Sequence, residues 1–508
     1  MNLDRYKHIA LGVATGSLLL VGLLLLLNSA ALEVLAGSGP LFVAPTGSGA
    51  ACSQAAPCAL QTGLAQAGDG NTVYLAGGTY TGTGGAVVTL TRSITLYGGW
   101  DGSTTAPPVR DPALHPTILD GERARRGIYI SGTISPTIEG FIITRGNGTG
   151  LGGGLFAGSD AGGGIYSQGA APIIQHNIIT DNVASTQAGV RALGGGVYIN
   201  DVPTAAIVRH NQILSNTAGI GIHLGDGGGL FFYGPTQVLA HTFGNNVACV
   251  GCTGQGGGLE AGWTTSDARI ADNTFEGNQA SRGGGLQVVW SAVDIQGNTF
   301  LDNNGGSRGG GLHAWYDKGS TINANRFISN TAISGGGMEV FITLPPFTTL
   351  TNNILARNRA DTGGGVHAWS DWHIAIITLT HNTLVDNGVG VLVGQHMTAT
   401  LVNNLLVSHT LAISRTRPES SVTVAHTLFW ANDEDGLRGS APVDGEPAFV
   451  DPARDEYHIT GSSAARDAGV DAGVSDDIDD DPRPSGAGYD IGADELVYHI
   501  YLPLIVRQ

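Results

Sequence analysis

Short apolar runs separated by glycine and asparagine recur along most of the chain. Each run is three to five residues long, and its apolar positions either alternate with polar ones or fill the run. Alternation with a period of two is typical of β-strands, whereas no stretch of 10 to 15 residues within these runs keeps the apolar spacing of a helix. The pattern therefore predicts many short strands joined by tight corners.

Two short sequence words define a repeat. The first is N-x-φ-x-x-N, where φ is apolar, with degraded copies at the third and last places. Its copies start 22 to 34 residues apart. They begin at Asn177, Asn211, His241, Asn273, Asn298, Asn325, Asn353, Asn382 and Asn404. The second word is three glycines followed by an apolar residue, and its copies begin at Gly162, Gly194, Gly227, Gly256, Gly283, Gly309, Gly335 and Gly363.

The repeat length selects among the repetitive folds. Repeats of roughly 20 to 50 residues form solenoids, propellers or arrays, and a propeller blade needs about 40. The shortest spacing here, 22 residues, is too small for a blade and suits one turn of a parallel β-helix. We therefore predict an all-β fold of roughly ten to thirteen turns, with Phe300 and Leu312 facing inward and His313 and Trp315 facing outward.

A structural role explains the Asn and Gly words better than a catalytic one. Asparagines at matching places in successive turns can stack their amides along the axis. Glycine at a corner permits a left-handed conformation and a close approach of the next turn.

The repeat words resemble those of a known group of surface proteins. FEGN, FLDN and FISN, each followed by GGGL or GGGM, are similar to the FxxN and GGA[ILV] repeats of polymorphic outer-membrane proteins. The resemblance implies a right-handed parallel β-helix that is exposed at a surface and linked to adhesion. The third residue of the glycine word is Gly in this chain and Ala in that group. For this reason we take only the fold and the surface location as implied for this chain.

The flanks resemble a wider group of bacterial secreted β-helix proteins. Residues 52–80 look like their N-terminal cap, with a cysteine pair, a short amphipathic helix and a first strand, and SITLYGGWDGS from Ser93 looks like the next turn. FVDPARDEYHITGSSAARDAG and the later DIGADE resemble a choice-of-anchor Q segment, which implies surface attachment. The expected organisation is 1–36 signal peptide or anchor, 37–110 cap and first turns, 111–430 β-helix repeats, 431–495 acidic segment and 496–508 apolar tail.

The N-terminus indicates export. Arg5 and Lys7 precede an uncharged apolar run from Ile9 to Leu27, and Val34 to Ala36 has the small-residue pattern of a signal-peptidase site. A cleaved signal and an uncleaved single-span anchor both remain open, since the run is just long enough to span a bilayer. Both place the remaining chain outside the cytoplasm, secreted or anchored at the cell surface. The tail at 496–508 is either a last strand or a sorting tag.

Charge is concentrated near the C-terminus. The net charge is −18, and residues 433–495 hold 18 Asp and Glu against 4 Arg, which gives −14 there. No basic stripe exists for nucleic acid. Within this region Asp477, Asp479 and Asp481 alternate as calcium ligands do, although a solvated acidic loop has the same pattern. No cofactor other than calcium is expected.

The four cysteines form two close pairs, Cys52 with Cys58 and Cys249 with Cys252. In an exported protein such pairs predict local disulfides. A zinc site using all four is disfavoured, because the pairs lie about 200 residues apart.

The residues after each GGG predict two outward rows on one sheet. Alternate side chains of a strand face the same way, and stacked turns lie about 4.8 Å apart. The first row reads Tyr166, Tyr198, Phe231, Glu260, Gln287, His313, Glu339 and His367. The second reads Gln168, Asn200, Tyr233, Gly262, Val289, Trp315, Phe341 and Trp369.

Exposed aromatic rows often mark binding surfaces, and aromatic faces beside polar groups suit sugar rings. The first function hypothesis is an exported protein that binds polysaccharide or surface glycan through Tyr233, Trp315, Phe341 and Trp369, with or without lyase or hydrolase activity. The alternative is a non-catalytic adhesin or envelope structural protein, in which inserts such as Leu344 to Phe347 cover the aromatics. We assume a monomer attached to the cell envelope.

The chemistry available on this face is sparse. His313, Glu339 and His367 lie on consecutive turns, which fits an acid/base or metal cluster and equally a charge-compensated ladder. Glycoside hydrolysis needs two carboxylates about 5 to 9.5 Å apart, and three turns place Glu260 and Glu339 about 14 Å apart. Pairing of Glu339 with Asp317 or Asp371 stays open, and Lys318 is the one base on the face that a lyase could use.

Overall fold

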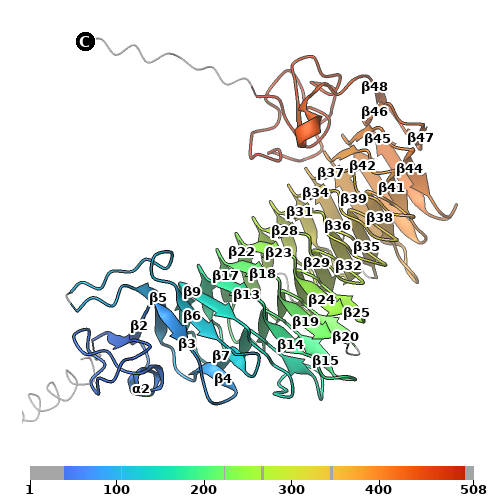
Figure 1. Cartoon of the computed structure of the whole chain (residues 1–508). Helices are drawn as coiled ribbons and strands as arrows, with labels where there is room; N and C mark the ends of the chain where they lie inside the picture. Colours follow the sequence, from blue (N-terminus) through green and yellow to red (C-terminus); the bar gives the residue numbers. More distant parts are fainter. Residues whose placement is uncertain (1–38, 105, 222–223, 265–267, 344–346, 498–508) are drawn as a thin grey trace, which may run out of the picture.

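The chain folds into a solenoid of parallel strands, shown in Figure 1. The structure is a computed structural model that describes residues 39–104, 106–221, 224–264, 268–343 and 347–497. Three long sheets of 14, 14 and 13 strands run along the solenoid, and each strand pairs in parallel with its counterpart one turn away. The predicted parallel β-helix is confirmed. Two of its sheets have 14 strands, one more than the upper end of the expected ten to thirteen turns.

Each turn contributes one strand to each sheet in a fixed order. Sheet 1 runs from β1 (Leu41–Val43) to β45 (Ser421–Ala425), sheet 2 from β3 (Gly78–Tyr80) to β48 (Val443–Asp444), and sheet 3 from β4 (Ala86–Leu90) to β47 (Glu434–Gly436). Four central turns carry the features discussed below. In each turn the strands are given in the order sheet 1, sheet 2, sheet 3. The first of these turns contains β27 (Arg269–Ala271), β28 (Thr274–Glu276) and β29 (Leu286–Val289), and the second contains β30 (Asp294–Gln296), β31 (Thr299–Leu301) and β32 (Leu312–Asp317). The third contains β33 (Thr321–Asn323), β34 (Arg326–Ile328) and β35 (Met338–Ile342), and the fourth contains β36 (Thr348–Thr351), β37 (Ile354–Ala356) and β38 (Val366–Trp369).

The asparagines of the first word form two buried ladders at the corners of sheet 2. Asn303 is representative: its Oδ1 accepts hydrogen bonds from the backbone N–H and the Nδ2 of Asn278, both at 3.0 Å. Its own Nδ2 donates to the Phe275 carbonyl at 2.8 Å and to Asn330 Oδ1 at 2.9 Å. Each asparagine therefore satisfies backbone groups that the corner leaves unpaired, and the predicted stacking of amides is confirmed.

Histidine replaces asparagine at two places in these ladders. His409 Nδ1 accepts the backbone N–H of Asn387 at 3.2 Å, and its Nε2 donates to the Leu384 carbonyl at 3.2 Å. His241 likewise accepts the backbone N–H of Asn211 at 3.1 Å. A neutral imidazole reproduces the acceptor and donor of an amide, but a protonated one loses the acceptor. Burial lowers the pKa of His409 to about 4.

Replacing His409 with asparagine should make the protein more resistant to acid. The folded state keeps His409 neutral, whereas the unfolded chain takes up a proton below about pH 6.5, so this site loses stability as pH falls from 6.5 towards 4. At about pH 5 the loss is on the order of 2 kcal/mol. Urea unfolding midpoints of His409→Asn and the parent should differ little at about pH 7.5 and diverge at about pH 5. Parallel pH dependence of the two proteins would show that this imidazole does not titrate on unfolding.

The glycine word marks a corner and a close approach between turns. The first glycine of each word has a left-handed φ, for example +56° at Gly309 and +64° at Gly335. The second and third lie against the backbone of the next turn, because a Cβ at Gly310 would come within 2.2 Å of the Gly336 carbonyl oxygen. The predicted structural role of these glycines is confirmed.

The interior is filled by side chains that stack along the axis. Phe300 and Leu312 are fully buried, as predicted. The ring of Phe300 stacks on Phe275 and on Phe327 with centroid distances of 4.8 and 4.5 Å. Stacked rings in an apolar interior contribute beyond the area that they bury.

The N-terminal end is closed by the expected short helix, α2 (Leu60–Gln66), whose Leu60 packs into the core. Cys52 and Cys58 form a disulfide beside it with a Cα–Cα distance of 4.6 Å, and Cys249 and Cys252 form a second at 5.4 Å. Both pairs are those predicted. The predicted export segment, 1–36, and nearly all of the apolar tail lie outside the described residues. Among the described residues, no helix has the length and apolarity needed to cross a membrane.

The acidic C-terminal segment folds back onto the outer face of sheet 2, beside the last turns (Figure 1). It contains the antiparallel pair β49 (Phe449–Asp451) and β50 (Glu456–Ile459). Tyr457 and Ile459 of β50 are buried in an apolar cluster with Ile354 and Leu405 of the β-helix. Apolar packing therefore holds the acidic segment on the β-helix.

Candidate functional site: an aromatic and cationic strip on sheet 3

The two outward rows on sheet 3 have the predicted register. His313 pairs with Gln287 on one side and with Glu339 on the other, and Glu339 pairs with His367. Trp315, Phe341 and Trp369 pair in the same way, with ring centroids 4.5 Å apart for Trp315 and Phe341 and 4.3 Å for Phe341 and Trp369. Stacking of turns thus brings residues more than 50 positions apart into one patch.

The exposure of the first row differs from the expectation. Tyr166, Tyr198 and Phe231 face away from the main core but pack under an inserted layer, β10 (Asp160–Ala161) and β15 (Arg191–Leu193) among its strands. Glu260, Gln287, His313 and Glu339 are also buried, with at most 1% of their surface exposed. Residues 344–346 of the insert lie outside the described residues, and Phe347 at its end is 53% exposed.

The two histidines near the end of this row are held by neighbouring polar side chains. His313 Nδ1 lies 2.7 Å from Gln287 Oε1, and His367 Nδ1 lies 2.7 Å from the Ser334 hydroxyl. Burial lowers the pKa of His367 to about 4 and holds the pKa of His313 well below its usual value. Both imidazoles are therefore neutral at physiological pH.

Glu339 holds the side chains of Trp369 and Arg308 in position. Its Oε1 accepts a hydrogen bond from Trp369 Nε1 at 2.7 Å and forms an ion pair with Arg308. Burial raises the pKa of Glu339, and Arg308 opposes that rise. With no exposed surface, this carboxylate orients the Trp369 indole and the Arg308 guanidinium from below.

The second row keeps part of its surface open. Trp315, Trp369 and Tyr233 are partly exposed, whereas Phe341 is buried between the two tryptophans. The expected exposure therefore holds for three of the four predicted binding residues and is wrong for Phe341, because the larger indoles cover its ring.

A further row of aromatics, at the corner where sheet 3 ends, was not predicted. Trp263, Trp290 and Tyr316 occupy this corner in three successive turns and have left-handed φ values of 47°, 52° and 55°. Among the residues that the structure describes, no other Phe, Tyr or Trp has a left-handed φ. This backbone conformation is strained for bulky side chains. Earlier turns place Gly169, Asp201 and Gly234 at this corner. The signal in the sequence was an aromatic residue where a turn would normally have glycine.

Ring contacts join Trp290 and Tyr316 of the corner row to the second outward row. Trp290 and Tyr316 stack with centroids 4.0 Å apart, and Tyr316 contacts Trp315 and Phe341 edge-on at 5.0 Å. Trp263 extends the row towards Tyr233 at 6.0 Å and has 37% of its surface exposed. We call this set the aromatic strip: Tyr233, Trp263, Trp290, Trp315, Tyr316, Phe341 and Trp369.

Three cations border the aromatic strip. Arg282 lies 5.6 Å above the Trp315 ring, Arg308 lies 5.2 Å from the Trp369 ring, and Lys318 lies 5.6 Å from the Trp290 ring. Arg308 is paired with Glu339, whereas Arg282 and Lys318 form no ion pair with any described residue. In a chain with a net charge of −18, this is a locally cationic surface.

The other acidic candidates lie elsewhere or are occupied. Asp317 is buried and accepts hydrogen bonds from the hydroxyls of Ser320 and Thr348, so it fastens the loop after β32. Asp371 is half-buried in the loop after β38, and the structure gives it no contact with Glu339.

The alternating aspartates do not gather around one point. Asp477 is buried, and its Oδ1 accepts the backbone N–H groups of Asp479 and Asp481 at 2.8 and 2.9 Å. Its Oδ2 accepts the backbone N–H of Glu495 at 2.9 Å. Asp477 therefore shapes the loop, and the Asp479 side chain points away from it towards His458.

Comparisons with known proteins support the fold. The family model described as right handed beta helix region matches residues 243–406, so the solenoid is a right-handed parallel β-helix. The solved pectate lyase Pel9A is 15% identical with a TM-score of 0.35, covering 91% of this chain and 97% of that chain. The alginate lyase from Paenibacillus sp. str. FPU-7 is 15% identical with a TM-score of 0.27, covering 76% and 98%.

The PL6 family alginate lyase AlyGC is 12% identical with a TM-score of 0.37, covering 84% of this chain and 57% of that chain. These three solved structures are a pectate lyase and two alginate lyases, each similar to this chain at 12 to 15% identity. A search of the curated proteins found no match.

Proposed function

We propose that the protein binds an acidic polysaccharide along the aromatic strip. The observation that carries this proposal is the joining of Trp290, Tyr316 and Trp315 into one partly exposed surface bordered by Arg282 and Lys318. Aromatic faces pack against the CH faces of sugar rings, and cations without an ion-pair partner can pair with carboxylates or sulfates on the sugar. The strained φ values at the corner support a functional role for these rings.

The strip suits a chain-like ligand. Its rings recur with each turn, about 4.8 Å apart, so a polymer can cross several of them at once. Glu339 acts here as a positioning residue for Trp369 and Arg308, and the activity proposed is binding. The same proposal includes export of the chain, as its N-terminal sequence predicts, to the outside of the cell, where polysaccharides are found, and attachment there through the acidic C-terminal segment.

Binding should depend on the strip and on its cations. We expect the double variant Trp290→Ala/Trp315→Ala to weaken binding of polygalacturonate or alginate by about 30- to 1,000-fold, since each ring contributes roughly 1 to 2 kcal/mol through the apolar area that it buries against the sugar. Affinity electrophoresis and calorimetry measure this. Arg282→Gln should weaken binding of the acidic polymers and leave any binding of a neutral glucan unchanged.

The control for this experiment is Trp430→Ala. Trp430 is 42% exposed and ends strand β46 (Leu428–Trp430) of sheet 2, on another face of the solenoid. Equal affinity of the double variant, Trp430→Ala and the parent would refute the strip as the site. Cleavage of the polymer by the parent would be measured by the absorbance of unsaturated products or by the release of reducing ends. Such cleavage would change the proposed activity from binding to catalysis, and the variant Glu339→Gln would then be assayed.

A further inference from the structure

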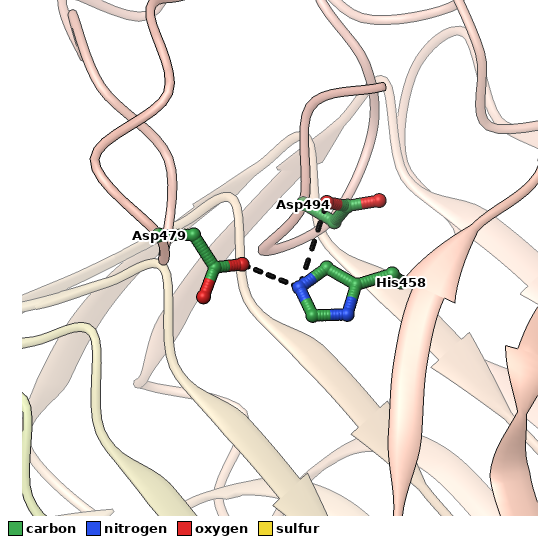
Figure 2. A group of neighbouring side chains, drawn as sticks. All are labelled: His458, Asp479 and Asp494. Atoms are coloured by element: carbon green, nitrogen blue, oxygen red, sulfur yellow. Dashed lines mark hydrogen bonds and ion pairs between the residues drawn. The ribbon is translucent and has the colours of Figure 1, made fainter. Parts of the chain in front are cut away.

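The C-terminal segment brings together one imidazole and two carboxylates from separate stretches of chain. His458 lies on β50, Asp479 in the acidic loop and Asp494 in the last described stretch. One ligand atom from each lies within 4.8 Å of the other two. Figure 2 shows both carboxylates facing the same side of the His458 ring.

The orientation of His458 is that of a metal ligand with a supporting partner. Its Nδ1 contacts Glu456 Oε1, which leaves Nε2 to face Asp479 and Asp494. Metal-binding histidines commonly donate their second N–H to a carboxylate, which fixes the ring and raises its basicity. Asp477 supports the second ligand, since it holds the backbone N–H of Asp479.

The charges around the imidazole also call for a cation. Glu456, Asp479 and Asp494 surround His458, and Arg326 of β34 lies 3.9 Å from Asp479. Even a protonated His458 and Arg326 together balance two of these three carboxylates. Asp494 is 9% exposed at its side chain, and its Oδ1 lies 3.9 Å from His458 while Oδ2 accepts the Ile459 N–H at 2.6 Å.

We propose that His458, Asp479 and Asp494 bind a divalent transition-metal ion, zinc foremost. Zinc–ligand bonds of about 2.1 Å place tetrahedral ligand atoms roughly 3.4 Å apart, so the group reaches this geometry with small side-chain movements. An imidazole with two carboxylates suits zinc better than calcium, which prefers six to eight oxygens. The ion reaches the site from solvent, because 28% of His458 and 44% of Asp479 side-chain surface is exposed.

The bound ion would act as a clip on the C-terminal segment. It would join β50, the acidic loop and the stretch around Asp494, of which β50 packs on sheet 2.

Calorimetry of the purified chain after EDTA treatment, at about pH 8, tests the site with zinc chloride. We expect one zinc ion per chain and a rise in the melting temperature of several degrees. Both responses should be lost in His458→Gln and in Asp479→Asn. They should persist in Asp480→Asn, an exposed neighbour, and in His373→Gln, an exposed histidine.

Cobalt(II) provides a readout that does not depend on stability. A visible absorption band that the parent shows and that His458→Gln and Asp479→Asn lack would support the site. Zinc or cobalt binding that is unchanged in both variants, or that is absent from the parent, would overturn the proposal. Calcium binding that needs Asp479 but not His458 would overturn the choice of a transition metal.

Discussion

Gly310→Ala should prevent the β-helix from forming its native stack at that turn. The new Cβ would lie 2.2 Å from the Gly336 carbonyl oxygen and 2.7 Å from the backbone N and O of Thr331. These are backbone atoms of the next turn, which the ladder hydrogen bonds hold in place, so relief requires separating two turns. We expect a loss of at least about 4 kcal/mol, the range of severe core defects.

Thermal melting and limited proteolysis measure this effect. Gly84→Ala is the matched control, because Gly84 has open space around its Cβ position and no left-handed φ. We expect that control to be neutral or slightly stabilising, since alanine restricts the unfolded chain. A melting temperature of Gly310→Ala within a degree or two of the parent would contradict the close approach of the turns.

Asn303→Ala should cost roughly 3 to 6 kcal/mol. The substitution leaves the backbone N–H of Asn278 and the Phe275 carbonyl without their partner, and Asn330 Oδ1 loses one of its donors. Each buried polar group that loses its hydrogen bond costs about 1 to 3 kcal/mol. The damage should spread to neighbouring turns, because the turns of a solenoid stabilise one another mainly through nearest-neighbour contacts.

Two variants calibrate this result. Asn304→Ala removes an exposed amide whose Oδ1 accepts only the Gly306 N–H at 2.8 Å, and it should change stability by less than about 1 kcal/mol. Asn303→His copies the residue that the chain uses at 409 in the same ladder, and it should recover part of the loss at neutral pH but not at about pH 4. Urea midpoints that rank Asn304→Ala with Asn303→Ala would show that the ladder is not a source of stability.

The two outward rows show where sequence reasoning succeeds and where it stops. Their register followed from the spacing of the GGG words, because each word starts a strand of sheet 3 at the same point of its turn. The exposure of the first row did not follow, since His313 and Glu339 face outward yet are covered. Exposure depends on what other segments do, and no local pattern records that.

The aromatic strip and the His458 group depended on tertiary structure for different reasons. Trp263, Trp290 and Tyr316 are single letters between a strand and a loop, and they became a row when three turns stacked. His458, Asp479 and Asp494 belong to irregular stretches with no repeat, so their meeting required the packing of β50 and the acidic loop against each other.

The sequence by itself determined the β-helix, its two asparagine ladders, its inward phenylalanines and its glycine corners. These features are local and periodic, so a hydrogen bond or a close approach repeated in each turn leaves a repeated letter. The tertiary structure alone decided which outward residues stay open to solvent and which distant carboxylates and imidazoles meet. Both depend on contacts between segments that no period relates, since covering a side chain and gathering charges are properties of the assembled surface.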